Sequence, residues 1–133
     1  MDTQTHHDFT RIVQQAQAIF TDVTYGSDAT PERAILRLQA TYGSYRVFIT
    51  ELRDATTRKY RYYVLKDAWV EAGFEYIPDP RALRLKYGKI GQHAGELVPH
   101  LHRENKQHLE LTDEMNMEDF IQWLREHFSG ENT

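Results

Sequence analysis

The spacing of the apolar residues changes twice along the chain, and this change restricts the fold more than any other feature. From residue 5 to residue 23 the apolar positions recur every three to four residues, which predicts an amphipathic helix. The same period returns over residues 117–128, where Asn116 can cap a helix and Glu118 and Asp119 suit its first turn. Between these segments the period is two, as in strands. The pattern predicts an α+β fold with an amphipathic helix near each end.

The alternating segments predict an antiparallel sheet of about four to five strands. Residues 34–42 and 45–52 flank Gly43-Ser44, a two-residue turn of the kind that joins hairpin strands. In this register Leu36 faces Glu51, which places a carboxylate on an otherwise apolar face. Further strands are expected at residues 59–65, 68–74 and 106–111, although residues 68–74 also fit a short helix. Residues 81–87 fit either a helical turn or a short strand.

Chain length and composition favour one domain over residues 1–133. The chain has no cysteine, which excludes disulfides, thiolate nucleophiles and cysteine-ligated metals. The first residues lack the basic and apolar regions of a signal peptide, and no apolar run approaches the roughly 20 residues of a membrane span. We therefore expect a cytoplasmic location and no membrane partner.

Charge is distributed unevenly along the chain. Residues 33–66 contain eight Lys or Arg and two acids, for a net charge of +6, and residues 81–106 have a net charge of +4. Residues 1–32 and 107–133 have net charges of −4 and −6. A basic middle could attract a polyanion such as RNA. It could equally form a basic sheet that packs beside acidic helices.

Two histidines in Pro99-His100-Leu101-His102 are the main candidates for chemistry. On a strand they would point to the same side, roughly 6–7 Å apart, where they could act as an acid and base pair or share a metal. An H-x-H pair supplies only half of a metal site, and no compact acidic triad lies beside it in the sequence. His93 and His108 are the candidates for a third ligand. We predict no metal and no cofactor, and a structural role for the pair stays open.

Basic and aromatic residues alternate in the run Arg58-Lys59-Tyr60-Arg61-Tyr62. This composition suits phosphate contacts combined with stacking of bases of single-stranded RNA. It also suits an ordinary strand with its rings half in the core and its cations in water.

Several short motifs in a fixed order carry a family resemblance. They are a strand reaching Glu51, the run Lys59-Tyr60-Arg61-Tyr62, Gly73-Phe74-Glu75-Tyr76-Ile77-Pro78, Pro99-His100-Leu101-His102, and a closing helix. In these motifs residues 33–128 resemble the TumE-like family, small bacterial proteins regarded as toxins of toxin–antitoxin pairs. The family has Asp-Asn in a turn where this chain has Glu75-Tyr76, so the acid is lengthened and the amide is lost. The resemblance implies a toxin with a cognate antitoxin as its partner.

Two functions from different classes follow as expectations. The first is a toxin with metal-independent ribonuclease-type activity, in which His100 and His102 are base and acid and Glu51 is an alternative base. Arg84 or Lys86 would then stabilise the developing phosphate charge. The second is a non-catalytic module that binds RNA or protein, with structural histidines. Homodimerisation is compatible with both, whereas a metal-dependent hydrolase needs more ligands than the spacing supplies.

Overall fold

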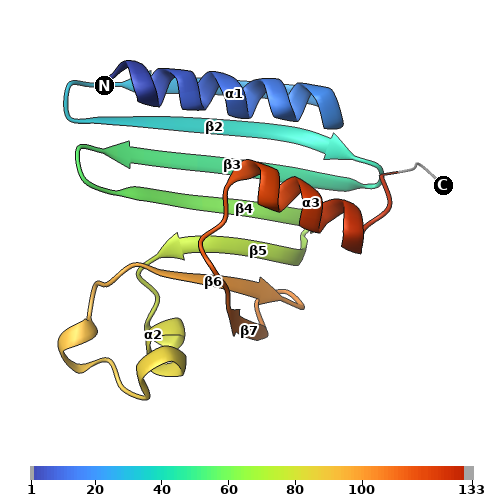
Figure 1. Ribbon diagram of the computed structural model, residues 1–133. Coiled ribbons are helices and arrows are strands. Elements are labelled where there is room, and N and C mark those ends of the chain that lie inside the picture. The colour runs from blue at the N-terminus through green and yellow to red at the C-terminus, as the bar shows by residue number, and fades with distance from the viewer. Residues whose placement is uncertain (1, 131–133) are drawn as a thin grey trace.

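Seven strands pair in the order in which they occur along the chain, so that each strand lies beside its neighbours in sequence (Figure 1). The computed structural model describes residues 2–130. The α-helices are α1 (Thr3–Ile19), α2 (Pro80–Tyr87) and α3 (Met117–His127), and a 3₁₀ helix, η1, covers Gly91–His93. The strands are β1 (Thr21–Ala29), β2 (Arg33–Tyr42), β3 (Tyr45–Asp54), β4 (Arg58–Lys66), β5 (Trp69–Ile77), β6 (Val98–Arg103) and β7 (His108–Leu111). All neighbouring pairs are antiparallel.

The predicted hairpin is confirmed with its register. Tyr42 pairs with Tyr45, and Leu36 pairs with Glu51. Gly43 has a φ of +60°, a left-handed conformation that glycine adopts without steric strain. The predicted helices at both ends are also confirmed, with Asn116 capping α3 through a reciprocal pair of hydrogen bonds with Asp119.

The number of strands differs from the prediction, which was four to five. The unpredicted β1 includes residues 21–23, over which the first helix was expected to continue. This edge strand is exposed along nearly its whole length, so it has no apolar alternation to detect. Strand β5 also extends beyond residue 74, where the fourth strand was expected to end, and continues to Ile77, which pairs with Val98.

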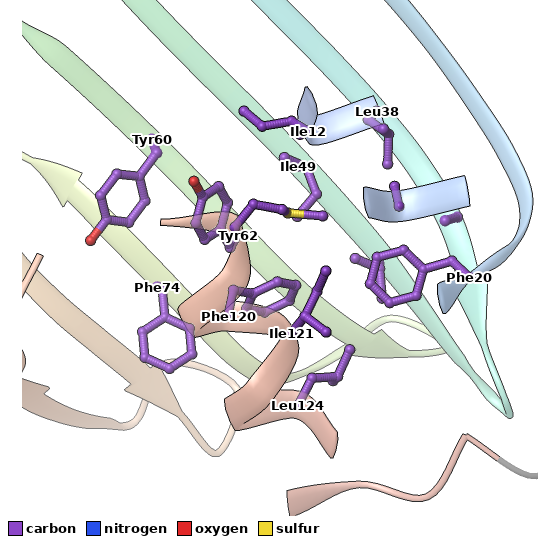
Figure 2. Packing of buried hydrophobic residues seen from close by; sticks show 14 of the residues in the cluster. Ile12, Phe20, Leu38, Ile49, Tyr60, Tyr62, Phe74, Phe120, Ile121 and Leu124 are labelled. Carbon is purple, nitrogen blue, oxygen red and sulfur yellow. The ribbon is translucent and has the colours of Figure 1, made fainter. Parts of the chain in front are cut away.

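Helices α1 and α3 cover the same face of the sheet, which we call the helix-covered face (Figure 1). Buried side chains from both helices and from five of the strands, β2–β6, form the main core. In Figure 2, Tyr62 and Phe74 of the sheet lie against Phe120 of α3, with ring centroids 5.3 and 6.1 Å from the Phe120 ring. Within residues 2–130, no helix lies above the other side of β1–β4 (Figure 1), and we call this side of the sheet the open face.

Helix α2 packs against the β6–β7 end of the open face. Its Ala82 and Leu83 contact Val98 of β6 in a second, small apolar cluster that Leu109 of β7 joins. Asp79 caps the helix, and Gly88 ends it with a φ of +81°. This cluster fixes the start of α2 beside β5 and β6. Among the described residues, no helix is long and apolar enough to cross a lipid bilayer.

Candidate functional site

Strand β6 directs both histidines of the H-x-H motif to the open-face side of the sheet. His100 has no exposed surface, and His102 is 4% exposed. Their rings meet edge to face with centroids 4.9 Å apart. The prediction that the two side chains lie together on one strand is therefore confirmed, but in the interior and not at the surface.

Two carboxylates that the sequence spacing did not suggest meet these histidines. Glu75 of β5 is the cross-strand partner of His100, and Asp79 follows β5 at the start of α2. His102 Nε2 lies 2.9 Å from Glu75 Oε1 and 3.5 Å from Asp79 Oδ2. His100 Nε2 lies 3.5 Å from Glu75 Oε1 and 3.4 Å from Asp79 Oδ2. We call these four residues the histidine–carboxylate cluster.

Outer contacts orient three of the four side chains. His100 Nδ1 lies 2.7 Å from the Val98 carbonyl oxygen, which fixes the tautomer with the proton on Nδ1 when the ring is neutral. Asp79 Oδ1 accepts hydrogen bonds from the backbone amides of Arg81 and Ala82 at 2.8 and 3.2 Å. Glu75 Oε2 lies 3.3 Å from Arg61 Nε. In each case the second polar atom of the side chain is left to face the centre of the cluster.

The electrostatics of the cluster follow from its burial and its partners. Burial alone would raise the pKa of Glu75, but the contacts with His100 and His102, and the charge of those rings when protonated, hold it well below its usual range. Burial raises the pKa of the neighbouring Tyr63, and the charge of Glu75 raises it further. Chemically, such a cluster can hold protons between imidazole and carboxylate or share one cation.

No protein-family model, curated protein sequence or solved structure matches the chain. The resemblance to the TumE-like family therefore stays a prediction, and the site has to be interpreted from its own geometry.

The other predicted catalytic residues are not in the cluster. Glu51 lies on the helix-covered face, on the opposite side of the sheet from His100. Arg84 and Lys86 are exposed on α2, and neither side chain forms an ion pair or hydrogen bond with the histidines. The candidate third ligands are also elsewhere: His93 lies 2.5 Å from Glu96 and His108 lies 3.5 Å from Glu110, both outside the cluster.

Glu51 forms hydrogen bonds with Arg58 and Tyr62, which give it a structural role. Arg58 donates to both of its carboxylate oxygens, at 3.1 and 2.9 Å, and the Tyr62 hydroxyl donates a short hydrogen bond to Oε1. Arg58 also donates to the Met115 carbonyl oxygen at 2.8 Å, just before α3. With 1% exposure and these partners, Glu51 serves to stabilise the core.

The alternating run on β4 divides between the two faces. Tyr60 and Tyr62 are buried at 1% and 0% exposure beneath α3, so neither ring is available for stacking on a base. Arg58 is engaged by Glu51 and Glu114. The predicted nucleic-acid contacts are therefore wrong for these three residues, because strand alternation turns them toward the core. Lys59 and Arg61 do lie on the open face.

The open face combines cations with two rings. Phe48 and Tyr63 are cross-strand partners and are half-buried. Arg46 and Lys106 lie over these rings, at 5.9 and 5.1 Å from the Phe48 and Tyr63 centroids, respectively. We define the basic face by the two rings and five cations: Phe48, Tyr63, Arg37, Arg46, Lys59, Arg61 and Lys106. Arg61 connects it to the histidine–carboxylate cluster through Glu75.

The sequence did not indicate Glu75 and Asp79 as site residues, because a long connection separates both from the histidines. The connection from β5 to β6 runs through α2 and η1, so no short hairpin turn reveals the pairing of Glu75 with His100. The available signal was the pair of prolines around Asp79, which favours a helix start with Asp79 as its cap.

Proposed function

We propose that this protein binds single-stranded RNA through the basic face. The observation that supports the proposal most is the pair of adjacent rings, Phe48 and Tyr63, surrounded by cations on a sheet surface that no helix covers. Aromatic side chains on an open sheet can stack on successive bases, and nearby cations can contact the phosphates.

The charges of the basic face are mostly available to a ligand. Among the described residues, Arg61 is the one cation of the five that pairs with a carboxylate. Arg46 donates to the neutral side chains of Thr41 and Gln39, which orient it without neutralising it. By contrast, Arg53 and Arg58 on the helix-covered face both pair with acids. The unpaired charge is thus concentrated where the rings are.

Catalysis by the histidine pair receives less support from the geometry. A general base or acid must approach within hydrogen-bonding distance of the RNA 2′-hydroxyl or leaving oxygen. His100 is fully buried, and the imidazole nitrogens that face the cluster are directed at Glu75 and Asp79 and not at solvent. We therefore favour a binding function over metal-independent cleavage.

The toxin role that the resemblance implies can be combined with this proposal. A toxin of this kind would inhibit growth by engaging RNA, and a cognate antitoxin would cover the basic face. An acidic antitoxin segment would complement that face for the same electrostatic reason as RNA.

Binding can be tested with a fluorescent oligouridylate by anisotropy at several salt concentrations. The double variant Arg37→Gln/Arg46→Gln removes two cations from the basic face, and Arg11→Gln/Arg125→Gln removes the same charge from exposed positions on α1 and α3. We expect the first variant to weaken binding and to lower the salt slope by about 1 for each lost phosphate contact. The second variant should bind like the wild type.

A stacking contribution is tested separately with Phe48→Leu, which retains charge. Base–aromatic stacking contributes roughly 1–3 kcal/mol per base, so affinity should fall by about 5-fold or more. Equal affinity of all variants, or equal loss in both charge variants, would contradict a defined RNA site on the basic face.

A further inference from the structure

We propose that Glu75, Asp79, His100 and His102 form a binding site for one first-row divalent metal ion, with zinc as the preferred occupant. One donor atom of each residue lies within 4.8 Å of all the others. Two imidazole nitrogens and two carboxylate oxygens are a ligand set that zinc accepts in tetrahedral sites. The inference does not depend on RNA binding.

The spacing of the donor atoms agrees with tetrahedral coordination. Ligands that lie about 2.0–2.2 Å from a tetrahedral zinc ion are roughly 3.3–3.5 Å from one another. Three of the four nitrogen–oxygen distances in the cluster are 3.4 or 3.5 Å. The fourth, between His102 Nε2 and Glu75 Oε1, is 2.9 Å and would open by about 0.5 Å when both atoms bind the metal.

One buried atom points specifically to a missing ligand. His100 Nε2 is buried and has no hydrogen-bond partner, although two carboxylate oxygens face it. Because Nδ1 contacts the Val98 carbonyl oxygen, the neutral ring presents a lone pair from Nε2 to the centre of the cluster. A lone pair facing two carboxylates is repulsive unless a proton or a metal ion lies between them, and a divalent ion would neutralise both carboxylates at once.

The outer contacts resemble those that support metal ligands in proteins. Asp79 uses one carboxylate oxygen to cap α2, and Glu75 uses one oxygen to pair with Arg61. The positive end of α2 and the Arg61 guanidinium therefore act on the outer oxygens, and the inner oxygens stay directed at the metal position. His102 is the exception, since its Nδ1 is buried without a hydrogen-bond partner.

Charge and ligand type restrict the ion. The buried carboxylate of Glu75 and the partly exposed carboxylate of Asp79, with one neighbouring arginine, leave a negative charge that a divalent ion would neutralise. Magnesium and calcium prefer oxygen ligands and retain waters, so two imidazoles argue against them. Four protein ligands with little exposed surface leave no open coordination position, which indicates a structural site. The metal would connect β5, β6 and the start of α2.

Metal binding can be measured on the full chain by titration calorimetry with zinc after chelator treatment, and by the visible spectrum with cobalt. Asp79→Asn is the most informative variant, because asparagine retains the helix cap and loses the inner carboxylate oxygen. Asp2→Asn makes the same change at the cap of α1. The background variant His6→Ala/His7→Ala removes a surface histidine pair that could bind metal by itself.

We expect one equivalent of zinc, an intense tetrahedral cobalt spectrum, and a higher Tm with zinc in the wild type, Asp2→Asn and His6→Ala/His7→Ala. Asp79→Asn should weaken zinc binding by about 100-fold or more and lose the cobalt spectrum. Glu75→Gln serves as a second ligand variant if Asp79→Asn does not fold. Wild-type protein without stoichiometric binding, binding unchanged in both ligand variants, or binding lost with His6 and His7 would overturn the proposal.

Discussion

Glu51 and Glu75 are both buried glutamates of the sheet, but they lie on opposite faces and have different partners. Glu51 lies under α3 and is paired with Arg58 and Tyr62. Glu75 lies on the opposite face of the sheet and meets two histidines. The same residue type therefore stabilises the core at one position and forms a candidate metal ligand at the other, and only the partners distinguish the roles.

Replacing Glu51 with Gln should destabilise the fold strongly. The change leaves the Arg58 guanidinium, whose side chain is 20% exposed, without its main counter-charge. Breaking a buried pair in this way costs about 3 kcal/mol. Urea unfolding followed by circular dichroism measures the difference in the free energy of unfolding.

Glu118→Gln is the matched control for that experiment. It removes the ion pair of Glu118 with Arg11, in which both side chains are more than half exposed. We expect an effect below about 1 kcal/mol, because solvent screens exposed ion pairs. Equal destabilisation by the two substitutions would contradict the structural role assigned to Glu51.

At the residue scale, the sequence predicted the residue pairs within one hairpin. It did not predict contacts between residues that a long connection separates. The register of β2 and β3 placed Glu51 on the apolar face, and the structure confirms that placement. The two histidines were recognised because they are two residues apart. Glu75 and Asp79 were not, because their distance from His100 in sequence is bridged by α2 and η1.

Strand β4 is the element that most clearly separates the two faces. Its tyrosines at 60 and 62 face α3, with the rings of this pair stacked at 4.7 Å, whereas Tyr63 joins the basic face. Burial raises the pKa of Tyr60 to about 12, and burial raises the pKa of Tyr62 well above its usual value. One strand thus contributes both to the core and to the proposed RNA surface.

Alkaline titration should reveal these tyrosines. Because their pKa values are higher in the folded chain than the unfolded value of about 10, the unfolded chain loses those protons first. Their contribution to stability is therefore fully present below pH 10 and decreases from pH 10 toward about 12. We expect the phenolate absorbance of these buried tyrosines to appear together with loss of the far-ultraviolet circular dichroism signal.

Tyr60→Phe provides the control, since it removes one late-titrating group and the hydrogen bond that its hydroxyl accepts from the Met115 amide. A single titration step near pH 10 in a protein that keeps its native circular dichroism would be inconsistent with the buried positions.

At the element scale, the sequence was informative wherever one side of an element is buried. Helices α1 and α3 and strands β2–β4 carry clear periodicity because one side of each meets the core. Strand β1 is exposed along both sides and β6 is largely buried along both sides, so neither alternates in the way an amphipathic strand does. The prediction missed β1 and β6 because neither strand shows a clear alternation of apolar and polar residues.

At the scale of the whole molecule, the uneven charge along the sequence becomes a difference in charge pairing between the two faces of the sheet. The interpretation that acidic helices pack beside a basic sheet finds support in the structure, whereas attraction of a polyanion stays a proposal. Cations that face the helices meet acids, as in the pairs of Arg53 with Asp8 and Arg58 with Glu114. Cations of the basic face have one such partner among the described residues, the pair of Arg61 with Glu75. The fold thus pairs cations with acids on one side of the sheet and leaves most cations of the other side without such a pair among the described residues.

Induced expression in bacteria tests the function that we propose at this scale. We expect the wild type to arrest growth, Arg37→Gln/Arg46→Gln to relieve the arrest, and Arg11→Gln/Arg125→Gln to leave it unchanged, at equal levels of protein. Growth that is unimpaired by abundant wild-type protein would count against a toxin.

The double variant His100→Ala/His102→Ala belongs in the same assay. Relief of arrest by this variant, with its fold and RNA affinity intact, would restore the prediction that the histidines perform chemistry. Arrest equal to that of the wild type is the result that a purely structural cluster predicts.

The sequential order of the strands has a consequence for synthesis on the ribosome. Because every strand pairs with the one before it, the sheet can grow hairpin by hairpin as the chain leaves the exit tunnel. Helix α3 follows all seven strands in the chain, yet it packs on Tyr62 and Phe74. Until α3 has emerged, we expect the nascent sheet to expose these rings to solvent and to be most prone to aggregation.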